Sequence, residues 1–174
     1  MPSKLKFYTC IVAALAIPGS VVAAVPQRLS LSTAMEAVKE TISVCQAEGY
    51  NVAVAVVDPD GVIQIQARGD GSPIHSQRFA YRKAYTVMSM GPMFGVETSG
   101  ELTEKITSVN PVGIANISAG STELLFLPGG VLIKSAGEPI AAIGVSGAPK
   151  SAQDEACANA GLNYIKMRLV ASRD

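Results

Sequence analysis

Residues 51–68, NVAVAVVDPDGVIQIQAR, decide the fold of this chain. An almost wholly apolar run up to Val57 is followed by the turn residues PDG, and then by a segment in which Gln64 and Gln66 alternate with apolar residues. This pattern predicts a β-hairpin whose first strand is central and whose second strand is more exposed. Because strands joined by a hairpin run antiparallel, we expect a largely antiparallel sheet.

The rest of the chain supplies further strands and several helices. Periodic apolar residues predict helices over 30–49, 75–90, 99–109 and 150–170. Three more apolar runs predict strands, TELLFL at 122–127, GGVLIKS at 129–135 and EPIAAIGVSG at 138–147. The sequence therefore predicts an α+β fold, a single domain with a five-stranded, largely antiparallel sheet flanked by helices.

The first 24 residues predict a secretory signal peptide. Lys4 and Lys6 precede a run without charge from Phe7 to Gln27, and small residues lead up to the expected cleavage after Ala23 or Ala24. Residues 25–174 would then form the mature domain, located in the periplasm or secreted. An uncleaved membrane anchor is the alternative, although the apolar run is short for a membrane span.

The charge balance excludes one class of partner. Two of the 14 basic residues lie in the predicted signal, which leaves 12 basic against 14 acidic residues, a balance of −2. This is not the basic footprint of a nucleic-acid-binding protein, and we expect no membrane contact after signal cleavage. Two cysteines, Cys45 and Cys157, follow the signal; they either form a disulfide in an oxidising compartment or pack as small apolar side chains.

The chain has one histidine, His75, which excludes several types of site. A zinc site built from histidine and cysteine would lack partners at ligand spacing. The sequence also contains no G-x-S-x-G nucleophile elbow and no glycine pattern of a Walker loop or dinucleotide site. Triad hydrolysis and nucleotide binding are therefore not expected.

The predicted helix over 75–90 gathers the side chains that can carry chemistry. An imidazole and two arginines are spaced three and four residues apart, and two tyrosines and a methionine lie on the adjacent stripe: His75, Arg78, Arg82, Tyr81, Tyr85 and Met88. Arginine pairs with carboxylates, aromatic rings contact flat apolar bodies, and imidazole binds a metal or moves a proton. We interpret this helix as a surface for an acidic ligand with a flat apolar body; the alternative is an ordinary solvated helix face.

The segment GVSGAPKS, from Gly144 to Ser151, is a second candidate site. A strand that ends at Gly144, Ser146 and Gly147 before a capped helix presents backbone N–H groups on which an anion could rest. Alternatively, the glycines only permit a tight turn or close packing.

Four motifs in this order resemble the GlcG/HbpS-type haem-binding (haem-degrading) family: RKAYT at 82–86, PGG at 128–130, GEPIAAIGVSGAP at 137–149 and DEACANAG at 154–161. The resemblance covers about residues 30–170. It implies a small α+β domain with an antiparallel sheet, often in symmetric oligomers. Carried over by position, it points to residues 82–86 as the family helix and to residues 144–147 as the family turn.

The resemblance implies an exported, homo-oligomeric haem-binding protein. We then expect His75 to be the axial iron ligand, and Tyr85 or Met88 to lie against the porphyrin. The propionates would pair with Arg78, Arg82 and Lys83. The remaining residues of the predicted cofactor site are Gly144, Ser146 and Gly147.

Two other functions fit the same residues. One is an enzyme or accessory protein that binds a small organic acid, with His75 as general acid or base and Arg82 or Lys83 as the carboxylate clamp. The other is an oligomeric sensor module with Tyr81 and Tyr85 at its interface. The sequence does not decide whether the protein is an enzyme.

Overall fold

The computed structural model describes residues 27–171, and the predicted signal peptide lies outside them. The hairpin is confirmed: β1 (Ala53–Val57) pairs antiparallel with β2 (Ile63–Arg68). The carboxylate Oδ1 of Asp58 closes the turn by accepting hydrogen bonds from the backbone N–H groups of Asp60 at 2.9 Å and Val62 at 3.0 Å. Every residue of β1 is buried and β2 is more exposed, as the apolar pattern predicts.

In the described part of the chain the sheet has four strands, in the order β2-β1-β4-β3. Strands β3 (Gly130–Ser135) and β4 (Glu138–Ser146) form a second hairpin, and β4 pairs antiparallel with β1. The α+β class and the antiparallel sheet are confirmed, but the fifth strand predicted over 122–127 is wrong. Side chains of the helix over 76–94 hold that segment: Thr86 Oγ1 accepts from the Leu125 N–H at 2.8 Å. A short apolar run is partly buried here against a helix instead of in a sheet.

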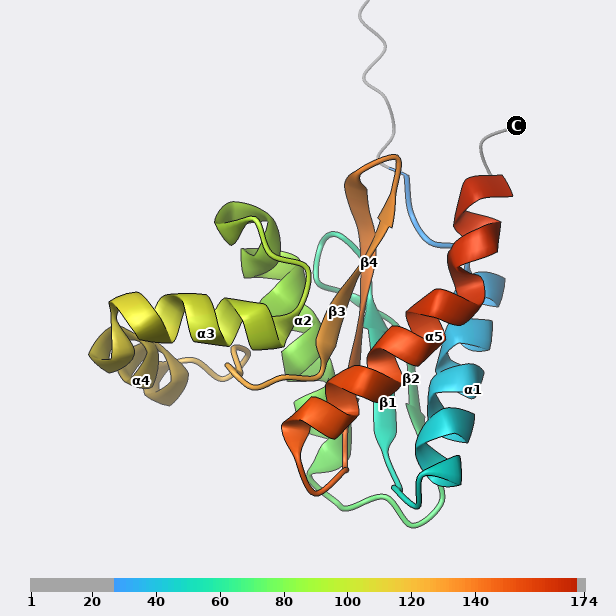
Figure 1. Ribbon diagram of the computed structural model, residues 1–174, viewed down its shortest axis with the longest axis horizontal. Helices are drawn as coiled ribbons and strands as arrows, with labels where there is room; N and C mark the ends of the chain where they lie inside the picture. Colours follow the sequence, from blue (N-terminus) through green and yellow to red (C-terminus); the bar gives the residue numbers. More distant parts are fainter. Residues whose placement is uncertain (1–26, 172–174) are drawn as a thin grey trace, which may run out of the picture.

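Helices α1 (Leu31–Ala47) and α5 (Ser151–Ala171) cover one face of the sheet (Figure 1). Ser30 caps α1, because its Oγ accepts from the Thr33 N–H at 3.2 Å. A disulfide between Cys45 and Cys157 joins the two helices across a sequence separation of 112 residues. The pairing that the sequence left open is therefore present.

Helix α2 (Ser76–Phe94) covers the opposite face (Figure 1). It packs closely on the sheet, since a Cβ added to Gly144 of β4 would lie 2.1 Å from the Ala80 carbonyl oxygen. The helix was expected to end at the Gly91-Pro92 pair, but it continues to Phe94 and ends at Gly95, whose φ of 64° is left-handed. Gly95 therefore ends the helix, in place of the Gly91-Pro92 pair that follows the predicted range 75–90.

Helices α3 (Ser99–Val109) and α4 (Pro111–Gly120) extend away from the sheet as an arm (Figure 1). Thr98 and Glu101 form a capping box at the start of α3, which was predicted over the same residues. Helix α4 was not predicted; Asn110 caps it by accepting from the Gly113 N–H at 2.8 Å, and none of its residues is buried. Among the described helices, none is both long enough and apolar enough to cross a membrane.

Candidate functional site

His75 lies at the N-cap position of α2 and its side chain is exposed. The imidazole makes no capping hydrogen bond, and it meets the Phe79 ring edge-on with the ring centroids 5.1 Å apart. On the next turn, the guanidinium carbon of Arg82 lies 5.9 Å from the Phe79 ring centroid. The imidazole is therefore held by a ring contact while its nitrogens stay available to a ligand.

A shallow hollow lies between β2 and the first turns of α2. Its volume is about 290 Å³, and we call it the α2 hollow; its lining residues are Ile63, Gln66, Ile74, Gln77, Arg78 and Tyr81. Ile74 is 88% exposed, so a large apolar side chain stands in solvent next to His75. An open surface that combines the apolar side chains of Ile63 and Ile74 with one guanidinium suits a flat ligand with an acidic group.

Arg82 does not point to this hollow. Its guanidinium donates to the carbonyl oxygens of Leu124 and, at 3.4 Å, Ser121, while its Nε is buried without a hydrogen-bond partner among the described residues. Arg82 therefore holds the segment that returns from the α3–α4 arm. The structure brings Arg78 next to the hollow and directs Arg82 elsewhere.

The other aromatic and apolar candidates on α2 occupy different surroundings. The rings of Tyr81 and Tyr85 have centroids 5.8 Å apart, and the Tyr85 ring covers Gly61 of the hairpin turn. Burial, reinforced by a hydrogen bond with Glu123, raises the pKa of Tyr81 to about 12. Its phenol therefore stays protonated near neutral pH and is not a ready phenolate ligand. Met88 is buried in the core beside β1 and β4, away from the hollow.

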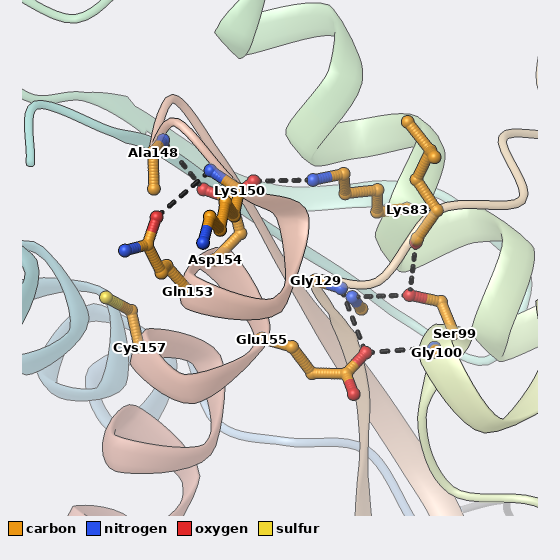
Figure 2. A network of polar contacts seen from close by, with 12 residues as sticks. Lys83, Ser99, Gly100, Gly129, Ala148, Lys150, Gln153, Asp154, Glu155 and Cys157 are labelled. Atoms are coloured by element: carbon orange, nitrogen blue, oxygen red, sulfur yellow. Dashed lines mark hydrogen bonds and ion pairs between the residues drawn. The ribbon is translucent and has the colours of Figure 1, made fainter.

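Lys83 lies in the interior and forms an ion pair with Asp154 of α5 (Figure 2). The Lys83 Nζ and Asp154 Oδ2 atoms are 2.7 Å apart, and the two side chains are 1% and 3% exposed. Burial lowers the pKa of Lys83 and raises the pKa of Asp154, while the attraction between the opposite charges opposes both shifts. The structure does not bring Lys83 together with His75.

The backbone donors near the predicted anion turn are taken by carboxylates of the protein itself (Figure 2). Asp154 Oδ1 accepts from the Ala148 N–H at 2.9 Å. Glu155 Oε2 accepts from the N–H groups of Gly100 and Gly129, each at 2.9 Å. No backbone N–H of Ala148, Gly100 or Gly129 is therefore left for an external anion.

The residues of the GVSG segment serve packing, which is the alternative that the sequence left open. Gly144 permits the close approach of α2 described above. Gly147 has a φ of 138°, and a Cβ at this position would lie 2.4 Å from the Asn51 carbonyl oxygen. Ser146 is buried at the end of β4.

The structure adds three residues that sequence reasoning missed: Ser99, Asp154 and Glu155. The buried Ser99 hydroxyl donates to the Leu127 carbonyl at 2.7 Å and accepts from the Gly130 N–H at 2.8 Å. For Asp154 and Glu155 the signal lay in the four quoted motifs, because these carboxylates and their partners Lys83, Gly129 and Ala148 all belong to them. Ser99 lies outside the motifs. These motifs are therefore the parts of one polar network that joins α2, α5 and the start of β3.

Comparison with known proteins identifies the family. The family model described as haem degrading protein HbpS-like matches residues 29–163. The chain belongs to the HbpS-like family. A crystal structure of a double mutant of Streptomyces reticuli HbpS is 31% identical with a TM-score of 0.71, and the match covers 90% of this chain and 99% of that one.

Two further structures have the same fold. A crystal structure of HbpS is 32% identical with a TM-score of 0.70, and the match covers 88% of this chain and 99% of that one. A PduOC–haem complex is 21% identical with a TM-score of 0.68, and the match covers 78% of this chain and 94% of that one. No curated protein sequence matches the chain. Membership of the HbpS-like family confirms the resemblance and associates the chain with haem at the level of the family.

The residues that line the α2 hollow, together with His75, which follows Ile74 in the chain, are of the chemical kinds that hold a haem. A porphyrin supplies four iron ligands itself, so the protein needs to add only one or two donors. His75 provides an exposed imidazole, Arg78 provides a cation for a propionate, and Ile63 and Ile74 provide apolar contact. The donor set and its surroundings are therefore of the right chemical kind.

Proposed function

We propose that this HbpS-like protein is an exported haem-binding protein and that its haem site is the α2 hollow. One observation carries the choice of site: the hollow is lined by Ile63, Ile74 and Arg78, and the next residue in the chain after Ile74 is His75, whose imidazole is exposed and uncapped. When bound, haem supplies an iron centre for ligand binding or redox chemistry. The matching family and the haem complex of a neighbour with the same fold support this function.

His75 and four of the residues that line the hollow have distinct roles in this proposal. His75 coordinates the iron, and Arg78 pairs with a propionate. Ile63, Ile74 and the protonated Tyr81 ring contact the porphyrin surface. Lys83 is not assigned to a propionate, because its ammonium group already pairs with Asp154 inside the protein.

The disulfide supports the exported location. Disulfides form and persist in oxidising compartments such as the periplasm and the extracellular space, and they are rare in the cytosol. The Cys45–Cys157 pair is buried between α1 and α5, where it links two elements that are far apart in the sequence. Together with the predicted signal over residues 1–24, this bond is the basis for placing the protein outside the cytoplasm.

Titration with haemin tests the proposed site. Purified protein is expected to shift the Soret band of haemin, and His75→Ala is expected to change the ligand-field spectrum and to weaken binding by at least about tenfold, or about 1.4 kcal/mol. Arg78→Ala should weaken binding with the spectrum unchanged. Lys150→Ala removes an exposed cation at the start of α5, and it serves as the matched control with no effect.

Haemin titration combined with a thermal-stability measurement separates haem from a smaller ligand. The volume of about 290 Å³ is also suited to a small carboxylate held by Arg78. If carboxylates raise the thermal stability of the protein and haemin gives no Soret shift, the hollow binds organic acids and the haem proposal fails. An unchanged spectrum and affinity in His75→Ala would remove the axial assignment.

A further inference from the structure

The imidazole of His75 meets the Phe79 ring across the first turn of α2. The two ring planes are inclined by 63°, with the centroids 5.1 Å apart. The Phe79 N–H donates to the His75 carbonyl at 3.1 Å, and the His75 backbone is already helical, with a φ of −78° and a ψ of −19°. Because residues four positions apart share one face of a helix, the backbone itself brings the two rings together.

This ring contact stands where a hydrogen bond is usually found. A histidine that binds a metal usually donates its second ring N–H to a carboxylate, a carbonyl or a water molecule, and this bond fixes the orientation of the ring. Within residues 27–171, the His75 side chain forms no hydrogen bond and no ion pair. Packing against Phe79 is therefore the contact that restricts the rotation of the imidazole.

The Phe79 ring is in turn held by Arg82. The guanidinium carbon of Arg82 lies 5.9 Å from the centroid of the Phe79 ring, a distance at which a cation is attracted to an aromatic face. The guanidinium also donates to the carbonyl oxygens of Ser121 and Leu124, so it cannot turn away without losing hydrogen bonds. We call the imidazole, the phenyl ring and the guanidinium of His75, Phe79 and Arg82 the His75 stack.

Phe79 contributes little to the packing of α2 on the sheet. Its side chain is half-buried and lies outside the hydrophobic core formed by the described residues. The neighbouring residues Ser76 and Ala80 are fully buried, and the Ala80 carbonyl lies directly over Gly144 of β4. A change at Phe79 should therefore disturb the His75 stack and leave the contact between α2 and the sheet in place.

We propose that Phe79 is the positioning residue of the haem site: it holds the His75 imidazole in one orientation before the ligand arrives, and Arg82 holds Phe79. A side chain that is already fixed loses less rotational freedom on binding, so the ligand binds more tightly. Phe79 acts through His75 and touches no ligand atom in this proposal. The use of the fixed imidazole for haem rests on the proposed function, whereas the fixed orientation itself does not.

Nuclear magnetic resonance of the haem-free protein tests the orientation. The chain contains a single histidine, so the untagged protein gives one set of imidazole proton signals. The ring current of Phe79 is expected to separate these signals from those of Phe79→Leu, and the wild type should show nuclear Overhauser contacts between the two rings. Phe94→Leu changes another half-buried phenylalanine at the far end of α2, and it should leave the signals unchanged. Identical imidazole signals in wild type and Phe79→Leu would overturn the proposal, whether or not haem binds.

Haemin titration then measures what the fixed orientation contributes. Phe79→Leu is expected to weaken haemin binding about twofold to tenfold, the range expected for loss of one aromatic pair, and to alter the ligand-field spectrum of the bound haem. Phe79→Tyr keeps the aromatic ring and should restore both the affinity and the spectrum. A lower urea midpoint in Phe79→Leu with an unchanged haem spectrum would show a structural role instead and would contradict positioning.

A double variant separates action through His75 from direct contact with the ligand. If Phe79 acts through the imidazole, Phe79→Leu should weaken haemin binding in the wild type and have no further effect in the His75→Ala background. Equal losses in the two backgrounds would assign Phe79 to the ligand surface and overturn the positioning role. If the imidazole signals show the ring contact and the wild type gives no Soret shift, the fixed orientation stands and the haem function fails.

Discussion

At the scale of single residues, the Lys83–Asp154 pair places two opposite charges in the interior of the protein. Both charges are almost wholly buried, and the desolvation of buried charges costs several kcal/mol per ion, which their attraction only partly offsets. The pair is therefore weak evidence for added stability. Its geometry instead fixes the position of α2 against the first turn of α5, because Asp154 also accepts from the Ala148 N–H.

The Asp154→Asn variant should be strongly destabilised. It leaves the ammonium group of Lys83 buried without a counter-charge, and such a change typically costs about 3–5 kcal/mol. Urea denaturation at neutral pH measures this loss. The double variant Lys83→Met with Asp154→Asn removes both charges but keeps an acceptor for the Ala148 N–H, so it should recover part of the lost stability.

The single variant Asp154→Asn should also gain stability as the pH rises. The pKa of Lys83 is already lowered in the folded protein, and loss of the carboxylate lowers it further. Between the folded pKa and the unfolded value near 10.5, the unfolded chain binds more protons, so raising the pH favours folding in this window. Urea midpoints of Asp154→Asn should therefore rise with pH in the range below the unfolded pKa of lysine, near 10.5. A flat profile, or the same slope in the double variant, would contradict this assignment.

At the scale of the elements, the fold depends on how closely α2 approaches the sheet. Gly130 of β3 and Gly144 of β4 lie under the helix, and a Cβ added to Gly130 would be 2.3 Å from the Lys83 carbonyl oxygen. Two neighbouring strands thus lack side chains along the line where the helix crosses. This contact positions the N-terminal end of α2, and with it His75 and Arg78, beside β2.

Gly144→Ala should force α2 away from β4. The new methyl group would overlap the backbone of Ala80 and Ala84, and overpacking of this kind costs about 1–3 kcal/mol or more. Thermal unfolding measures the loss, and haemin titration should show weaker binding because the hollow changes shape. Gly120→Ala, at the end of α4 with no atom within 4 Å of its added Cβ, is the matched control and should be neutral or slightly stabilising. Equal stability in the two variants would exclude the packing role.

The sequence predicts elements more reliably than contacts between them. The hairpin over 51–68 and the helices over 30–49 and 99–109 have clear periods and caps, and the structure confirms them. Segment 122–127 fails because a short apolar run does not show whether a sheet or a helix will bury it. Helix α4 was missed because it contains two glycines and buries no residue, so that no apolar stripe marks it in the sequence. The closeness of His75 and Arg78 follows from helical spacing, whereas the Lys83–Asp154 contact joins residues 71 positions apart and leaves no periodic signal.

At the scale of the whole molecule, one covalent bond ties the first helix of the domain to the last. The disulfide joins α1 to α5 on the face opposite α2, and it closes a loop that contains the whole sheet. Cross-links that close long loops restrict the unfolded chain most, so the expected contribution is large in the chain-entropy model. The stability of the protein should therefore depend on the compartment in which it folds.

The exported protein should begin at Ala24 or Val25 and carry the intact Cys45–Cys157 disulfide. Mass spectrometry without reductant would show a mass lacking two hydrogens relative to the dithiol. A variant without residues 2–24, retained in the cytoplasm, should keep both thiols reduced and unfold with a free energy lower by about 2–5 kcal/mol. The double variant Cys45→Ala with Cys157→Ala removes the bond in either compartment, so its urea midpoint should not depend on location or reductant. If the exported wild type shows two free thiols, or if its first residue is still Met1, the link between disulfide, export and stability fails.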